Sequence, residues 1–185
     1  MTWTIVSILV ALALYAVFTY NGLVALRQRV NQAFGDIDVQ LKQRRDLIPN
    51  LVETVKSYAT HERETLDSVI QARQFALNAQ GSFEQAGAEQ ALTGALGRLI
   101  ALAEAYPDLK ASHNFQQMQS DLSDIENKLA AARRFFNNTV SEYNAAIEAF
   151  PAALFARGLG FTHRDFFNIG DATRQQLDTP PTVKF

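Results

Sequence analysis

The sequence contains no cysteine, which excludes disulfide bonds, thiolate catalysis and zinc sites with cysteine ligands. It also has no excess of positive charge, because 17 basic and 19 acidic residues leave a formal net charge of -2 at pH 7. Binding to a phosphate backbone normally needs such an excess, so we expect no nucleic-acid partner. With 185 residues, 48% of them hydrophobic, the chain is long enough for one sizeable core.

Charged side chains are absent from the first 26 residues, and residues 5–18 are almost wholly apolar. Trp3 and Tyr20 flank this run, as interfacial aromatic residues do at the two surfaces of a bilayer. A helix of about 20 apolar residues spans a hydrocarbon core of roughly 30 Å. We therefore expect residues 1–26 to form a transmembrane anchor with Trp3 and Tyr20 at the membrane interface.

A cleaved signal peptide is the alternative interpretation of this segment. Signal peptides open with basic residues and close with small ones, whereas here no basic residue precedes the run and Phe18, Thr19 and Tyr20 are poor cleavage-site residues. We therefore favour a retained anchor. The positive-inside rule places the C-terminal part in the cytoplasm, because the first basic residues all follow the run: Arg27, Arg29, Lys42, Arg44 and Arg45. The chain is thus expected to cross a membrane once.

Apolar residues recur every three or four positions through most of the remaining chain, which predicts amphipathic helices. We expect helices at about 21–45, 46–80, 82–105 and 112–150. Asp46 has the character of an N-cap and Pro49 suits the first turn of a helix, so a bend is expected near Arg45. Ser82 and Gln85 have the spacing of a capping box at the start of the third helix.

The fourth predicted helix has the clearest apolar strip, formed by Phe115, Met118, Leu122, Ile125, Leu129, Ala132, Phe136, Val140, Tyr143, Ile147 and Phe150. Such a strip must be buried against other helices. The sequence therefore predicts an all-α fold, in which the transmembrane helix continues into a long antiparallel, coiled-coil-like bundle over residues 27–150. No segment has the period of a β-strand.

Residues 151–185 form a different kind of segment, which is interrupted by glycine and proline and is rich in phenylalanine. Phe155, Phe161, Phe166 and Phe167 are candidate contacts with a partner or with the membrane. Packing on the bundle, on the membrane surface or on a neighbouring subunit all suit such a cluster, and the sequence leaves the three outcomes open.

Two groups of polar residues are candidates for a functional site. Asp36, Asp38, Arg44, Arg45 and Asp46 are expected to form a polar cluster at the predicted bend, capping helix ends or pairing with charges on the last helix. His61 and Glu62 do not complete a zinc motif, because residue 65 is Thr65 where a second histidine would be needed. We therefore predict no catalytic, cofactor-binding or metal-binding residues.

Several blocks of the chain resemble the LemA family. The first is Tyr20 to Arg27 followed by Asp36 to Lys42, and the most typical one is Arg45 to Val52 with Tyr58, His61-Glu62 and Ala72-Arg73. A further block comprises Tyr106 to Lys110, Asn114-Phe115, Glu126-Asn127, Ala132 to Arg134, Tyr143-Asn144 and Phe150-Pro151. The chain departs from the family pattern at Phe34, where tryptophan is usual, and at Phe135-Phe136, where Tyr-Asn is frequent.

The resemblance implies a bacterial single-span membrane protein with a long helical hairpin or bundle, and a role as a scaffold or accessory protein of the membrane. Together with the apolar strips, this favours a membrane-anchored scaffold that self-associates into a homo-oligomer or organises partner proteins, and that is not an enzyme. An adaptor for a membrane protease or an envelope-stress system is the alternative. A hydrolase using His61 and Glu62 is a third and weaker hypothesis.

Overall fold

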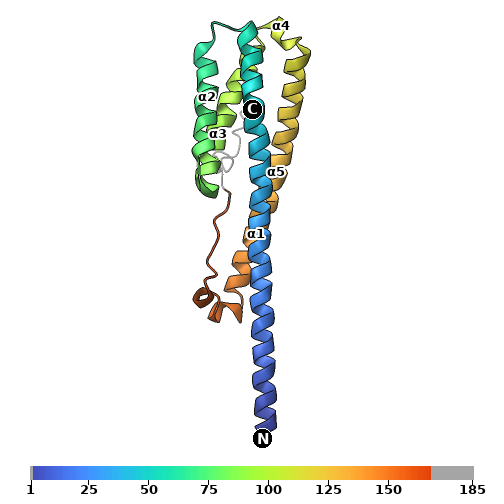
Figure 1. The fold of residues 1–185 in the computed structure, drawn as a ribbon, viewed down its shortest axis with the longest axis vertical. Helices are drawn as coiled ribbons and strands as arrows, with labels where there is room; N and C mark the ends of the chain where they lie inside the picture. Colours follow the sequence, from blue (N-terminus) through green and yellow to red (C-terminus); the bar gives the residue numbers. More distant parts are fainter. Residues whose placement is uncertain (1, 168–185) are drawn as a thin grey trace, which may run out of the picture. The chain divides into compact units, whose positions relative to one another are not determined.

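A computed structural model describes residues 2–167, in which every regular element is a helix (Figure 1). The elements are α1 (Thr2–Tyr58), α2 (Arg63–Asn78), α3 (Gly81–Ala103), α4 (Pro107–Lys110), α5 (His113–Glu148) and the 3-10 turns η1 (Ala152–Leu154) and η2 (Arg157–Leu159). The predicted all-α fold class is confirmed. The predicted C-terminal tail extends to residue 185, and its part beyond residue 167 lies outside the described residues.

The chain divides into two compact units, and α1 and α5 each contribute to both. Residues 2–38 and 131–165 form the first unit, while residues 39–130 with Phe166 and Phe167 belong to the second.

In the first unit the two long helices run antiparallel. Phe34 of α1 packs on Phe136 of α5 with ring centroids 5.6 Å apart, and the more N-terminal Arg29 forms an ion pair of 3.2 Å with the more C-terminal Glu142. The contact buries the apolar strips that the sequence predicts, with Leu23, Val30, Ala33 and Ile37 on α1 and Phe136, Val140, Tyr143 and Ile147 on α5. Burial of these strips away from water stabilises the pair.

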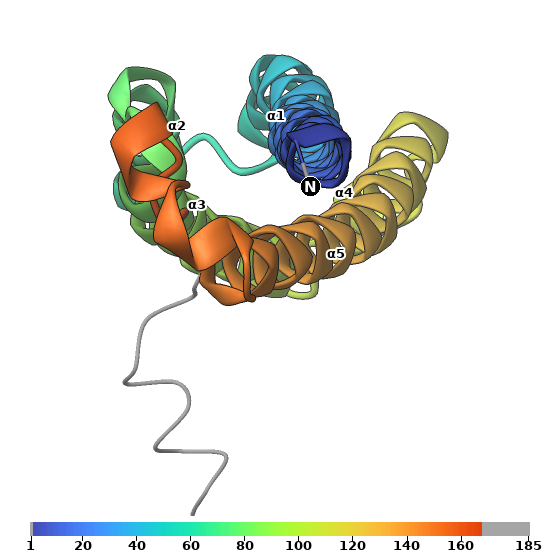
Figure 2. The same ribbon diagram turned by 90° about the horizontal axis from the view of Figure 1, so that it is seen from below.

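The second unit is a bundle of four longer helical segments and the short helix α4 around one core. Its buried residues come from every segment and include Ile48, Leu51 and Val55 of α1, Leu66 and Val69 of α2, Leu92, Leu96 and Leu99 of α3, and Phe115 and Leu122 of α5. Helices α2 and α3 form a hairpin across a turn of two residues and lie side by side, as Figure 2 shows in the view along the bundle. Short connections between antiparallel neighbours are typical of such bundles.

Helix α1 is not interrupted near Arg45, so the prediction of a new helix from Asp46 is wrong. It continues through Pro49, which lies in its interior, and ends at Tyr58. A proline at position 49 cannot donate a hydrogen bond to the carbonyl of Arg45, four residues earlier. In the folded chain Arg73 Nε of α2 donates to that carbonyl oxygen at 2.9 Å. A side chain from another helix thus replaces the missing backbone donor.

The start of α3 also differs from the prediction. The N-cap is Gln80 and the helix begins at Gly81, whose φ of +76° is a left-handed conformation that glycine adopts without strain. The Glu84 carboxylate accepts a hydrogen bond from the Gln80 backbone N–H at 3.1 Å. The predicted capping box is therefore wrong, and a side-chain hydrogen bond at this helix end is made by Glu84, one residue before the predicted Gln85.

Candidate functional site

The five residues of the predicted polar cluster all lie within α1, and none of them is at a helix end. Asp36 is exposed and Asp38 is half-buried in the first unit, while Arg44, Arg45 and Asp46 belong to the second. None of them caps a helix end, because α1 has no end near these residues. Arg44 and Arg45 instead bind neighbouring helices.

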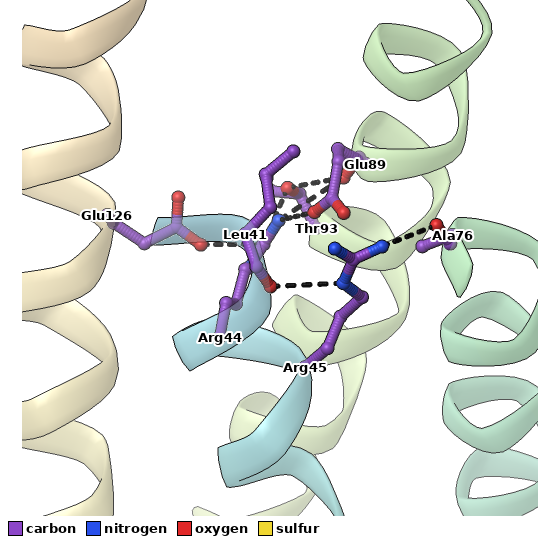
Figure 3. A network of polar contacts seen from close by, with 7 residues as sticks. All are labelled: Leu41, Arg44, Arg45, Ala76, Glu89, Thr93 and Glu126. Atoms are coloured by element: carbon purple, nitrogen blue, oxygen red, sulfur yellow. Dashed lines mark hydrogen bonds and ion pairs between the residues drawn. The ribbon is translucent and has the colours of Figure 1, made fainter. Parts of the chain in front are cut away.

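Arg44 is the centre of a network that joins three helices (Figure 3). Its Nη1 donates to Glu89 Oε2 of α3 at 2.8 Å, and its Nη2 contacts Glu126 Oε1 of α5 at 2.6 Å. Thr93 Oγ1 accepts a further hydrogen bond from Nη2 at 2.7 Å. The side chains of Arg44 and Glu89 are each 1% exposed, so the ion pair lies in the interior of the bundle.

Sequence analysis missed Glu89 and Glu126. Glu89 had a detectable signal, because it lies three residues before Leu92 on the apolar strip that continues through Leu96 and Leu99. A carboxylate on a buried helix face needs a partner, and the pattern therefore pointed to a buried cation. The sequence does not identify Arg44 as that cation, since several basic residues are available.

Arg45 and Asp46 make contacts of different kinds. Arg45 Nη1 donates to the Ala76 carbonyl of α2 at 2.8 Å and Nε to the Leu41 carbonyl at 3.2 Å (Figure 3). Asp46 is exposed and pairs with Lys42 one turn earlier. The hydrogen bond from Lys42 lowers the pKa of the Asp46 carboxyl below its usual value.

His61 and Glu62, the incomplete metal motif of the sequence, have different environments. His61 is exposed, whereas Glu62 Oε1 accepts a hydrogen bond from the Tyr106 hydroxyl at 3.0 Å. This hydrogen bond raises the pKa of Tyr106 above its usual value. Within residues 2–167 no three histidine or carboxylate side chains gather in a way that could hold a metal ion. The polar contacts of Arg44, Arg45 and Glu62 thus connect helices to one another.

A second region of interest lies in the first unit, where the chain beyond α5 returns to α1. Phe161 is buried, packs edge-on against Tyr20 with centroids 5.6 Å apart, and lies 5.0 Å from the Arg27 guanidinium. Asn144 of α5 fixes the returning chain with two hydrogen bonds of 2.9 Å to the backbone of Arg164. The segment from η1 to Arg164 is therefore held on its own unit.

The four phenylalanines singled out in this segment have different environments. Phe161 and Phe167 are buried, Phe155 is half-buried and Phe166 is exposed. The most exposed large apolar side chains of the region are instead Phe150, Leu154 and Leu159, which the sequence analysis did not select as contacts. Phe150 was predicted to continue the buried strip of α5, but that helix ends at Glu148 and the side chain is 82% exposed.

The N-terminal part of α1 carries an apolar run that is long enough to cross a membrane. None of this run is buried against other parts of the described chain, and Trp3 and Tyr20 at its ends are exposed. A core helix of the same composition would be largely buried. The exposure therefore favours a segment whose apolar surface meets lipid.

The chain is similar to proteins of known name over most of its length. It is 26% identical to the magnetosome protein MamQ of Magnetospirillum gryphiswaldense, with 93% of this chain and 73% of that protein covered. It is 24% identical to magnetosome protein MamQ 2 of Paramagnetospirillum magneticum (95% and 75% covered), and 25% identical to protein LemA of Metamycoplasma hominis (86% and 73% covered). The sequence profile of the LemA family matches residues 33–185. This chain belongs to the LemA family.

Proposed function

We propose that this chain is a membrane-tethered helical scaffold, which crosses the bacterial inner membrane once and associates with copies of itself or with partner proteins through its bundle. The observation that carries the proposal is α1 itself. One unbroken helix begins with an apolar run that no other part of the described chain covers, and then contributes to the core of both helical units. Membership of the LemA family supports a membrane-associated protein of this kind.

The second unit also supports an association role through its surface. Four large apolar side chains of α2 and α3 remain exposed, namely Ile70, Phe75, Leu77 and Phe83. Exposed groups of this size on neighbouring elements are typical of protein contact surfaces. Ile70 and Leu77 are seven residues apart and share one face of α2, whereas Phe75 lies on another face. The charge pairs around Arg44 hold α1, α3 and α5 together and stabilise the bundle that carries these side chains.

Site-specific crosslinking in native membranes tests the association. Because the chain has no cysteine, the variant Asn78→Cys places a single thiol beside Leu77, and Asn127→Cys places one on the exposed face of α5 as a matched control. A bifunctional maleimide is expected to produce homodimers through residue 78 and few through residue 127. Monomer alone at both positions would refute self-association, and one crosslinked product with a different protein would favour the adaptor function.

The same thiols test the proposed orientation. Basic residues follow the apolar run and none precedes it, so the positive-inside rule predicts that the part of the chain after the run, including all of α5, lies in the cytoplasm. A membrane-impermeant maleimide added to spheroplasts should therefore label Asn127→Cys only after the inner membrane is disrupted. Labelling of intact spheroplasts would reverse the orientation.

A further inference from the structure

The segment that follows α5 is fixed on the first unit but turns large apolar side chains outward. Ala152, Ala156 and Phe161 are buried and attach it to the helices. In the same segment Phe150 is 82% exposed, Leu154 75% and Leu159 51%. Large apolar side chains that stay more than half exposed in an otherwise anchored segment point to a further contact, because their exposure to water is unfavourable.

The position of this segment indicates which surface it meets. Phe150, Pro151 and Ala152 line one side of a groove whose other side is the apolar run of α1, including Tyr15 and Phe18. Tyr20, the predicted interfacial residue, contacts Phe161 from the same segment. Tyr15 precedes Tyr20 by about 7.5 Å along a helix axis. Interfacial elements bury their apolar face about 5–10 Å into the membrane surface, so a groove that reaches Tyr15 lies within this depth below Tyr20.

The charges of the segment are complementary to a lipid headgroup layer. Residues 151–164 contain Arg157 and Arg164 and no acidic residue, while His163 lies 3.2 Å from the Glu148 carboxylate of α5. Arg157 and Arg164 are exposed, and Arg27 of α1 lies over the Phe161 ring. Basic side chains beside exposed apolar ones are the combination that binds an anionic membrane surface.

We propose that residues 150–159 are a second membrane contact, in which Phe150, Leu154 and Leu159 insert into the headgroup region of the bilayer that α1 enters. The inference rests on the proposed membrane tether and adds an interfacial element to it. The span fixes the chain in the bilayer, and the inserted segment fixes the height and tilt of the first unit at the surface. A second copy or a protein partner covering these side chains is the competing outcome.

Fluorescence quenching of the full-length protein in vesicles of phosphatidylcholine and phosphatidylglycerol tests this contact. Single-cysteine variants Leu154→Cys, Val10→Cys and Ser141→Cys carry the same environment-sensitive label in the segment, in the apolar run and on an exposed turn of α5. We expect a nitroxide on the lipid acyl chain to quench the label at residue 154 several-fold more than the label at residue 141. A water-soluble quencher should give the opposite order.

The three positions separate failure of the inference from failure of the tether. If the label at residue 154 behaves like that at residue 141 while the label at residue 10 is quenched from lipid, the interfacial contact is wrong and the span remains. If the label at residue 10 is reached only from water, the tether fails as well. Protection of residue 154 from both quenchers would mean that protein covers it, which also overturns the proposal. Circular dichroism confirms that all variants keep their helix content.

Discussion

Arg44 is the largest fully buried side chain among residues 2–167, and its charge is balanced from two other helices. Removing a cation from water costs several kcal/mol unless partners surround it closely. Glu89 and Glu126 reach Arg44 only when α3 and α5 pack in the correct axial register against α1. The network thus selects one register of the bundle, which apolar contacts alone specify less strictly.

Substituting Arg44→Met should destabilise the bundle by about 3–5 kcal/mol, because Glu89 would remain buried without its cation. Adding Glu89→Leu should recover part of this loss, since the second substitution removes the stranded charge. Urea unfolding in detergent, followed by circular dichroism, measures both free energies of unfolding. Lys128→Met on the exposed face of α5 is the matched control and should change stability by no more than about 0.5 kcal/mol. If the Arg44→Met variant were as stable as the Lys128→Met control, the structural role of Arg44 would be contradicted.

Tyr106 allows a prediction about pH. The protonated hydroxyl donates to Glu62, so the pKa of Tyr106 is raised in the folded chain above its ordinary value of 10.0. A raised pKa means that the folded state holds the proton more tightly than the unfolded chain. The hydrogen bond therefore stabilises the fold fully below about pH 10 and loses this effect as the pH rises through the folded pKa.

Tyrosinate absorbance of the protein and of Tyr106→Phe, subtracted from each other, gives the titration of this one residue. The midpoint should lie above 10 in the folded protein and return to about 10 in urea. Equal midpoints in the two states would mean that the Glu62 contact does not persist in solution.

At the scale of elements, local sequence rules predicted helix faces better than helix ends. The spacing of apolar residues identified the buried sides of α1 and α5 because burial follows from helix geometry. The end predicted near Arg45 was wrong because Asp46 and Pro49 resemble the start of a new helix, and the donor that keeps α1 continuous, Arg73, is remote in sequence. Long-range hydrogen bonds of this kind leave no periodic signal. The contacts of Arg44 were hidden for the same reason.

The pairing of Pro49 with Arg73 gives a prediction for the element. Arg73→Met should cost about 1.5–3 kcal/mol, because the Arg45 carbonyl would lose the charged donor that replaces the absent N–H of Pro49. In a Pro49→Ala background the backbone N–H of residue 49 returns, so the same substitution should cost less. A double-mutant cycle of unfolding free energies measures the difference. An equal cost in both backgrounds would show that the two residues act independently.

For the whole molecule, the similarity to the LemA family and the evidence for a membrane span come from different parts of the chain. The family profile begins at residue 33, after the apolar run of α1. The support for the tether comes from the absence of charge before Arg27 and from the exposure of the apolar run. Sequence alone indicated the span but not which side chains of the segment after α5 stay outside the core. Phe150 continues the apolar spacing of α5, and the 3-10 turns that carry Leu154 and Leu159 are too short to show a periodic face.

An arginine placed in the apolar run provides the test at this scale. Val10→Arg should weaken membrane insertion by about 2.5–3.5 kcal/mol, the cost of a guanidinium near the centre of a spanning helix, and Val6→Arg in addition should weaken it further. Val39→Arg is the matched control, since Val39 lies on the same helix and Val10 and Val39 are each 52% exposed. Carbonate extraction should release the Val10→Arg and double variants in increasing amounts and leave the Val39→Arg protein in the pellet. If all variants stay in the pellet like the unchanged protein, the apolar run of α1 is not what holds the chain in the membrane.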